Sequence, residues 1–311
     1  MKITDIKLYT YNLSLINGKT KEGIIIEVFD DLGNKGTGEV SPLLNWSHES
    51  FKDALDFTIN LKNAILSGNF SPFTLPPSVM FGMQSALNQL ICPLKSDLTF
   101  EKTKLIFNYK ENLSGPVKLK LGNFNLQSGI KIVEKLLSQP ISLRLDFNRK
   151  WKLEDTIEFC QHFAPNNFVY LEEPVINYSD IAKFYEKTNF SFALDEHLLQ
   201  HPIEDIITNK GLTHLIIKPS LHGGITQCQE LQNKAGNIKC IFSSAYETSV
   251  GLSNIVKIAN TLSPNTPIGI DTLDMLKTDI LNCPSPLNEN ILKKDIFNNM
   301  PLNHKLLKPV L

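Results

Sequence analysis

The sequence lacks the features that mark several large classes of protein. Its 31 basic and 32 acidic side chains nearly cancel, so it has no excess of positive charge for binding nucleic-acid phosphates. The five cysteines are an odd number and include no Cys-x-x-Cys pair, which argues against a zinc or dithiol site. No early strand-like segment is followed by Gly-x-Gly-x-x-Gly, so a dinucleotide-binding fold is disfavoured. These absences leave a protein of ordinary globular composition, with no nucleic-acid partner expected.

Long hydrophobic runs are also missing. The first seven residues alternate polar and apolar side chains, unlike a signal peptide, so we expect a cytoplasmic protein. Residues 63–94 carry no charge, but prolines such as Pro76 and Pro77 interrupt the stretch and its amide side chains would be costly in lipid. The sequence therefore predicts a buried helix from Ser78 and no membrane partner.

The chain length and the pattern of its first part predict more than one domain. At 311 residues the chain is about twice the usual length of a single domain. We predict an α+β capping domain over 1–98, a catalytic barrel over 99–285, and a C-terminal segment over 286–311 that returns to the cap. In the cap, strands are expected over 3–13, 23–29 and 36–40, and helices over 47–66 (with Ser47 as N-cap) and 78–91.

After residue 104 the pattern changes to short β-rich runs that alternate with helical stretches. The predicted strands are 117–121, 141–147, 168–171, 191–194, 214–218, 238–243 and a short one near Ile268. Helices are predicted over 126–137, 153–163 and 181–188. Alternation of this kind is typical of parallel β-sheet, and the fold class is therefore α/β.

Polar or small residues follow the strands at a regular interval. The positions are Lys120, Asp146, Glu172, Asp195, Lys218, Ser243 and Gly269, and successive gaps are 26, 26, 23, 23, 25 and 26 residues. One strand, one helix and two short loops take roughly 25 residues. In a parallel barrel the carboxyl ends of all strands converge on one mouth, where active sites lie, whereas an open sheet would spread them along an edge. We therefore predict a barrel.

Three of these strand-end residues are carboxylates on consecutive strands. Asp146, Glu172 and Asp195 would face one another, and like charges so placed need a cation or raise each other's pKa. Oxygen ligands with open positions suit Mg²⁺, with Mn²⁺ as the alternative ion. The competing interpretation is that each carboxylate pairs with a lysine or caps the next helix.

Lysines would flank this cluster from two sides. Lys118 and Lys120 lie two apart on one strand and therefore share a face, and the flanking apolar residues Val117, Leu119 and Leu121 point to the other face. Lys218 arrives from across the ring, unless it forms a salt bridge with Asp195 or Glu196. A metal beside two lysines suits removal of a proton α to a carboxylate, because the metal neutralises the developing enediolate and a neutral lysine accepts the proton. Arg144, Asn148 and Glu196 are expected to orient these groups.

These motifs resemble those of the enolase superfamily, muconate-lactonizing subgroup, and within it the o-succinylbenzoate synthase family. The resemblance rests on the following segments: 117–120 (VKLK), 143–151 (LRLDFNRKW), 171–174 (LEEP), 194–196 (LDE), 217–219 (IKP), 38–43 (GEVSPL), 77–82 (PSVMFG), 243–252 (SSAYETSVGL) and 269–273 (GIDTL). They span nearly the whole chain.

The resemblance implies a modified (β/α)7β TIM-type barrel with an N-terminal capping domain, and magnesium on Asp146, Glu172 and Asp195. It implies a hydro-lyase that dehydrates 2-succinyl-6-hydroxy-2,4-cyclohexadiene-1-carboxylate to 2-succinylbenzoate in menaquinone biosynthesis. Lys120 would take the α-proton and help the hydroxide leave on the same face, and Lys218 would hold the intermediate. Substrate contacts are implied for the following residues: Lys118, Ser243 and Gly269.

Relatives with the same lysines and metal racemise N-succinylamino acids or epimerise dipeptides, and either is the alternative function. Residues 219–224 contain no acidic side chain to bind a peptide amine, which favours the synthase. An inactive barrel that serves as a scaffold is disfavoured because every expected catalytic position is filled. By analogy, residues 17–22 and 43–47 shape specificity. The sequence predicts a small-molecule substrate but no oligomeric state.

Overall fold

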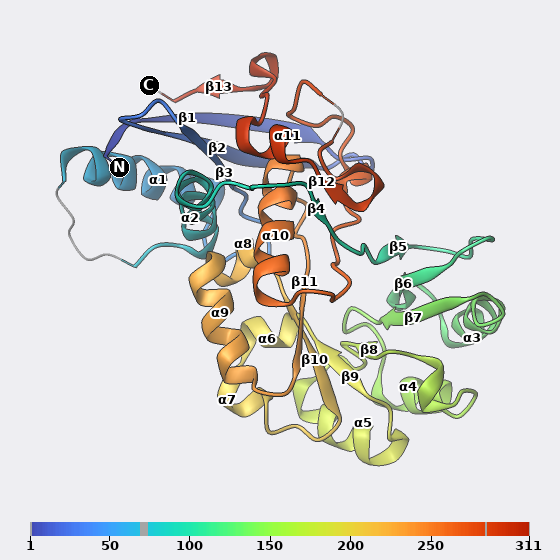
Figure 1. Cartoon of the computed structure of the whole chain (residues 1–311). Helices are drawn as coiled ribbons and strands as arrows, with labels where there is room; N and C mark the ends of the chain where they lie inside the picture. The colour runs from blue at the N-terminus through green and yellow to red at the C-terminus, as the bar shows by residue number, and fades with distance from the viewer. Residues whose placement is uncertain (1, 69–73, 284, 311) are drawn as a thin grey trace. The chain divides into compact units, whose positions relative to one another are not determined.

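The structure, a computed structural model, describes residues 2–68, 74–283 and 285–310. The chain divides into two compact units (Figure 1). The first unit consists of residues 1–101, 218–230 and 242–311, and the second of residues 102–217 and 231–241. In the described part of the chain, no helix combines the length and apolar character needed to cross a membrane. The predicted domain boundaries at 98/99 and 285/286 stay a prediction.

The first unit is built on an antiparallel sheet in the order β13-β1-β2-β3. Its strands are β1 (Ile3–Ser14), β2 (Thr20–Asp30), β3 (Lys35–Val40) and β13 (Lys308–Pro309). Buried side chains alternate in each half of β1, at Ile6 and Leu8 and then at Tyr11 and Leu13, so the buried face changes along the strand. β13 pairs with β1 at Tyr9 and Thr10, so the C-terminal segment adds a strand to the N-terminal sheet.

Two helices, α1 (Phe51–Ser67) and α2 (Pro77–Ile91), pack against this sheet and share a core with it. The predicted start of the first helix is wrong: Ser50, not Ser47, is the N-cap, because Ser50 and Asp53 form a reciprocal capping box. Ser47 instead accepts a hydrogen bond from the Leu43 backbone. The sheet and α2 come so close that a Cβ on Gly38 would lie 1.9 Å from the Gly82 carbonyl oxygen.

The later segments of the first unit are mainly helical. They are α8 (Pro219–His222), α10 (Ser249–Leu262) and α11 (Lys294–Asn299), with a small sheet of β4 (Leu98–Thr99) and β12 (Ile291–Leu292). The helix α9 (Gly224–Ala235) begins in the first unit and ends in the second.

The second unit contains a sheet of seven strands in the order β11-β10-β9-β8-β7-β6-β5. The strands are β5 (Lys104–Ile106), β6 (Gly115–Lys120), β7 (Ile141–Asp146), β8 (Leu171–Glu172), β9 (Phe192–Leu194), β10 (Leu212–Ile217) and β11 (Lys239–Phe242). Neighbours from β5 to β10 pair in parallel. The strand β5 was not predicted. The short strand expected near Ile268 appears as one parallel bridge between Ser243 and Gly269, in the first unit.

Helices follow the strands of the second unit as the alternating pattern predicts. They are α3 (Leu126–Leu136), α4 (Leu153–Cys160), α5 (Ile181–Thr188), α6 (Glu196–Gln200) and α7 (Ile203–Ile206). Parallel strands in chain order with intervening helices form a half-barrel. The predicted α/β class, with an N-terminal antiparallel part followed by barrel-type strand–helix units, is confirmed.

Candidate active site

Three carboxylates stand at the carboxyl ends of consecutive strands in the second unit. Asp146 ends β7, Glu172 ends β8, and Asp195 directly follows β9. Asp146 and Glu172 are register partners, and all three residues are almost completely buried. Buried carboxylates this close together need compensating charge.

Two lysines of β6 supply positive charge to this cluster. Nζ of Lys118 lies 3.0 and 3.1 Å from the two carboxylate oxygens of Glu172 and 3.5 Å from Oδ2 of Asp146. Nζ of Lys120 lies 2.5 Å from the same Oδ2. The strand register explains the arrangement, since Lys120 pairs with Asp146 and Asp146 pairs with Glu172. Both lysines therefore share the face of the carboxylates, as the alternation in β6 predicts.

The pKa directions follow from this mixture of burial and charge. Burial raises the pKa of Glu172 well above its ordinary value, and the charges of Asp146 and Asp195 add to the effect. Burial alone would also raise the pKa of Asp146, but the ammonium groups of Lys120 and Lys118 outweigh it and lower that pKa. For Lys118, the attraction of Glu172 and Asp146 outweighs burial and raises the pKa well above its ordinary value. These contacts favour the ammonium form of Lys118.

The structure gives contacts for the residues predicted to orient the cluster. The backbone N–H of Asn148 donates to Oδ1 of Asp146 at 2.9 Å, and its side-chain amide donates to Oε1 of Glu196 at 3.3 Å. The guanidinium of Arg144 donates to the Ser142 carbonyl and lies 5.8 Å from the Tyr170 ring centre. Arg144 lies two residues before Asp146 on the same strand face and pairs in register with Lys118, and the orienting roles stay predictions.

Glu173, the neighbour of Glu172 for which no site role was predicted, is fully buried. Its Oε1 accepts hydrogen bonds from the backbone N–H groups of Asp195 and His197, at 2.7 and 2.9 Å. The backbone of Glu173 has φ of +48°, outside the strand region, so the strand ends at Glu172. The adjacent pair Glu172-Glu173 was the available signal.

The remaining predicted residues belong to the first unit. Nζ of Lys218, which follows β10, lies 4.7 Å from the centre of the Trp46 ring. The Ser243 hydroxyl donates to the Gly269 carbonyl at 2.9 Å, and a Cβ on Gly269 would lie 2.7 Å from that hydroxyl oxygen. The roles of Lys218, Ser243 and Gly269 stay predictions. Trp46 lies within the 43–47 segment for which a role in specificity was expected.

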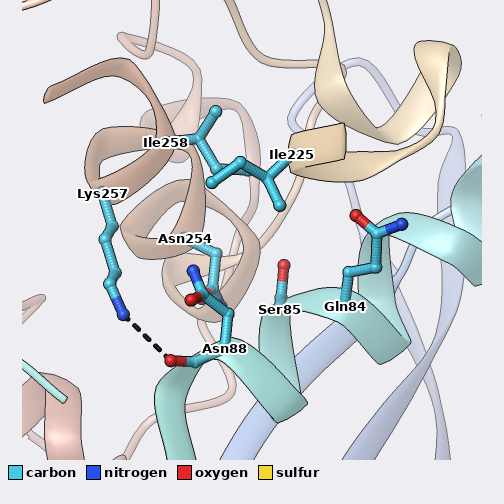
Figure 2. A pocket seen from close by; sticks show the side chains of 7 residues that line it. All are labelled: Gln84, Ser85, Asn88, Ile225, Asn254, Lys257 and Ile258. Carbon is cyan, nitrogen blue, oxygen red and sulfur yellow. Dashed lines mark hydrogen bonds between the residues drawn. The ribbon is translucent and has the colours of Figure 1, made fainter. Parts of the chain in front are cut away.

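A pocket in the first unit lies among α2, α9 and α10 (Figure 2). Its lining residues are Gln84, Ser85, Asn88, Ile225, Asn254, Lys257 and Ile258. Nζ of Lys257 donates to the Asn88 carbonyl at 3.2 Å and contacts the Cys92 carbonyl, both at the end of α2. A cation at a helix C-terminus stabilises the helix dipole, so these contacts connect helices and suggest no chemistry.

Comparison with known proteins places the chain in a family. Residues 109–286, more than half of the chain, match the family model described as enolase C-terminal domain-like. The chain belongs to the enolase C-terminal domain-like family. Residues 3–90 match a second model, described as the MenC N-terminal domain.

Curated relatives of this family member match along most of its length. It is 28% identical to the o-succinylbenzoate synthase of Pectobacterium atrosepticum over 300 residues, which cover 89% of this chain and 92% of the relative. It is 29% identical to the o-succinylbenzoate synthase of Proteus mirabilis, over 89% of this chain and 93% of the relative.

Solved structures share the fold of this family member. A substrate complex of the L-Ala-D/L-Glu epimerase of Bacillus subtilis matches with a TM-score of 0.75 at 20% identity, over 91% of this chain and 93% of that chain. The o-succinylbenzoate synthase of Thermosynechococcus elongatus, complexed with magnesium in its active site, matches with a TM-score of 0.71 at 19% identity, over 90% and 95%. At these identities the structural matches show the fold alone.

Within the described ranges, no group of three or more His, Cys, Asp or Glu side chains is arranged as a metal site. The ammonium groups of Lys118 and Lys120 lie on the carboxylate oxygens of Glu172 and Asp146 instead. The magnesium ligands predicted from the sequence therefore stay a prediction.

Proposed function

We propose that this enolase-family chain is an o-succinylbenzoate synthase, a hydro-lyase of menaquinone biosynthesis that acts on a small-molecule substrate. It converts 2-succinyl-6-hydroxy-2,4-cyclohexadiene-1-carboxylate to 2-succinylbenzoate. The observation that carries the proposal is the match of about nine-tenths of the chain to curated o-succinylbenzoate synthases, together with the MenC match of residues 3–90. Cytoplasmic location stays a prediction.

The donor set suits a divalent cation. Asp146, Glu172 and Asp195 offer only carboxylate oxygens, which hard cations such as Mg²⁺ prefer, and Mn²⁺ is the alternative. The raised pKa of Glu172, caused by burial and its carboxylate neighbours, indicates that the cluster needs more positive charge than its lysines provide. When bound, the cation neutralises charge that develops on the substrate carboxylate.

Lys120 is the proposed base. Lys120 is the last residue of β6, and its side chain is the more exposed of the two lysines, at 21% against 13% for Lys118. Nζ of Lys120 contacts Oδ2 of Asp146, so the base would lie beside a proposed ligand of the cation. The electrons of the broken C–H bond form the new C=C bond, the C–O bond breaks, and Lys120 returns its proton to the departing hydroxide. Water leaves from the same face, and aromatisation drives the step.

Lys118 and Lys218 hold charge and do not move protons in this proposal. The ammonium of Lys118 contacts the carboxylates of Glu172 and Asp146, so it would compensate part of their negative charge beside the base. Lys218 would stabilise the anionic intermediate, with Ser243 and Gly269 near the succinyl carboxylate.

The test is a spectrophotometric assay with the cyclohexadiene substrate and Mg²⁺, following loss of the diene absorbance. Lys120→Ala should lower kcat by about 10² to 10⁴, the usual contribution of a general base. EDTA should abolish the activity, and added Mg²⁺ should restore it. Lys110→Ala, a change at an exposed lysine in the same unit, is the matched control.

The alternative is N-succinylamino acid racemisation or dipeptide epimerisation with the same lysines and metal. Exchange of deuterium into those substrates without loss of the diene would move the protein to that branch. Exchange lost in Lys120→Ala would still support the proposed base.

A further inference from the structure

Glu173 is directed to the backbone at the end of the next strand. Its side chain is fully buried, and Oε1 accepts from the N–H groups of Asp195 and His197 at 2.7 and 2.9 Å. The φ of +48° at Glu173 costs free energy in a residue other than glycine. A strained residue with two buried hydrogen bonds to one turn fixes that turn.

His197 completes the arrangement from the other side. Its Nδ1 is in direct contact with Oε2 of Glu173, and the His197 ring is buried. Among the described residues, neither of these two atoms has a further hydrogen-bond partner. Losing this contact would leave two buried polar atoms unsatisfied, which is unfavourable in the folded state.

The turn held by this pair carries Asp195 and Glu196. Asp195 has φ of −124° and ψ of −76°, outside the regular strand and helix regions, so its conformation depends on its surroundings. Glu173 binds the N–H groups on both sides of Glu196, whose Oε1 accepts from Asn148. The backbone from which the Asp195 carboxylate extends is therefore held by Glu173.

We propose that Glu173 and His197 are a pair of positioning residues that present Asp195 to a divalent cation. The inference rests on the metal site of the proposed function and names residues beyond the proposed ligands. Groups that orient metal ligands typically change metal affinity 10- to 100-fold when they are removed.

Two substitutions at His197 distinguish the effect of losing the N–H donor from the effect of losing the imidazole ring. His197→Leu removes the nitrogen that contacts Glu173. His197→Asn keeps an N–H donor near the place of Nδ1 and should restore binding. His201→Leu is the matched control. His201 follows the same helix as its C-cap, and its ring stacks on Tyr178 with the ring centres 4.0 Å apart, whereas the structure shows no bond from it to Glu173 among the described residues.

The experiment is a calorimetric titration of each protein with Mg²⁺ in the absence of substrate. We expect the Kd for Mg²⁺ to rise at least about tenfold in His197→Leu and to return to within about threefold of wild type in His197→Asn. His201→Leu should bind as wild type does. A Kd within twofold of wild type in folded His197→Leu would overturn the inference. If His197→Leu does not fold, His197→Gln replaces it. The amide of glutamine lies one bond farther from the backbone than that of asparagine, so His197→Gln should bind Mg²⁺ more weakly than His197→Asn.

Hydrogen–deuterium exchange of the metal-free proteins gives a second readout. The backbone amides of residues 192–200 should exchange faster in His197→Leu than in wild type, and at the wild-type rate in His201→Leu. Unchanged exchange would overturn the inference even if wild type bound no Mg²⁺. Normal Mg²⁺ binding without dehydration of the diene would instead overturn the proposed function and leave the inference standing.

Discussion

Replacing Glu39 with leucine should destabilise the first unit, because this carboxylate is an acceptor for several buried donors at once. Glu39 lies on β3 and is fully buried. It accepts from the Tyr11 hydroxyl at 2.5 Å, the Thr248 hydroxyl at 2.6 Å, and the Gly251 backbone N–H at 2.8 Å. The Thr248 backbone N–H adds a bond at 3.1 Å. Glu39 thereby satisfies the first turn of α10, for which Thr248 is the N-cap.

The size of the effect follows from these contacts. Leucine leaves four donor groups without their acceptor, and each buried unsatisfied donor costs about 1–3 kcal/mol. Removing the carboxylate also removes its own burial penalty, and the hydroxyl donors can turn to other acceptors. At about 1 kcal/mol for each donor, we expect a net loss of about 4 kcal/mol.

Urea unfolding followed by circular dichroism at pH 7 measures this loss. Glu22→Leu is the control, because Glu22 is exposed on the neighbouring strand and should change stability by less than about 0.5 kcal/mol. The apparent melting temperature of Glu39→Leu should fall by roughly 8 °C or more. A loss below about 1 kcal/mol would refute the reasoning, since the buried donors would then have partners that the structure does not show.

Three further predictions concern pH, charge and packing. Burial raises the folded-state pKa of Glu39 above its ordinary value of 4.5. The contribution of Glu39 to the free energy of unfolding is therefore complete below pH 4.5, and it is lost as the pH rises through the raised pKa. The unfolding free energy of wild type minus that of Glu39→Gln should therefore fall above about pH 4.5, and a flat difference would contradict this. Lys118→Met removes the ammonium beside Glu172, so it should tighten Mg²⁺ binding roughly tenfold while lowering kcat; weaker binding in calorimetry would be the contrary result. Gly38→Ala places a Cβ 1.9 Å from the Gly82 carbonyl oxygen and should cost at least about 1–3 kcal/mol in urea unfolding, whereas unchanged stability would show that α2 can shift.

Strand positions in the second unit could be predicted because each strand carries a short β-rich run that ends in a polar or small residue. The exception shows the limit of that signal. β5 has three residues and begins with Lys104, and no polar residue of the periodic series marks its end. Its place at the sheet edge depends on pairing with β6, which is a long-range interaction that the local pattern does not contain.

The strand face of a site residue could be predicted, but its partner could not. Alternation along β6 correctly places Lys118 and Lys120 on one face, and the register brings Lys120 beside Asp146. Alternation gives the face of Arg144 but not its hydrogen-bond partner, which is the Ser142 carbonyl, beside the Tyr170 ring. The N-cap at Ser50 could have been found, since Asp53 stands three residues later.

The adjacent residues Glu172 and Glu173 are both buried carboxylates, but they contact different groups and have different roles. Glu172 continues the strand face and joins Asp146, Lys118 and Lys120, where burial and its carboxylate neighbours raise its pKa. Counting Asp195, three carboxylates face two ammonium groups, so these five side chains are short of positive charge. Glu173 does not join this cluster: its carboxylate accepts from backbone N–H groups, which compensate its charge. With a divalent cation bound and Lys120 neutral as the base, the cation and these five side chains would together carry no net charge, so the cluster would no longer repel the anionic substrate of the proposed reaction.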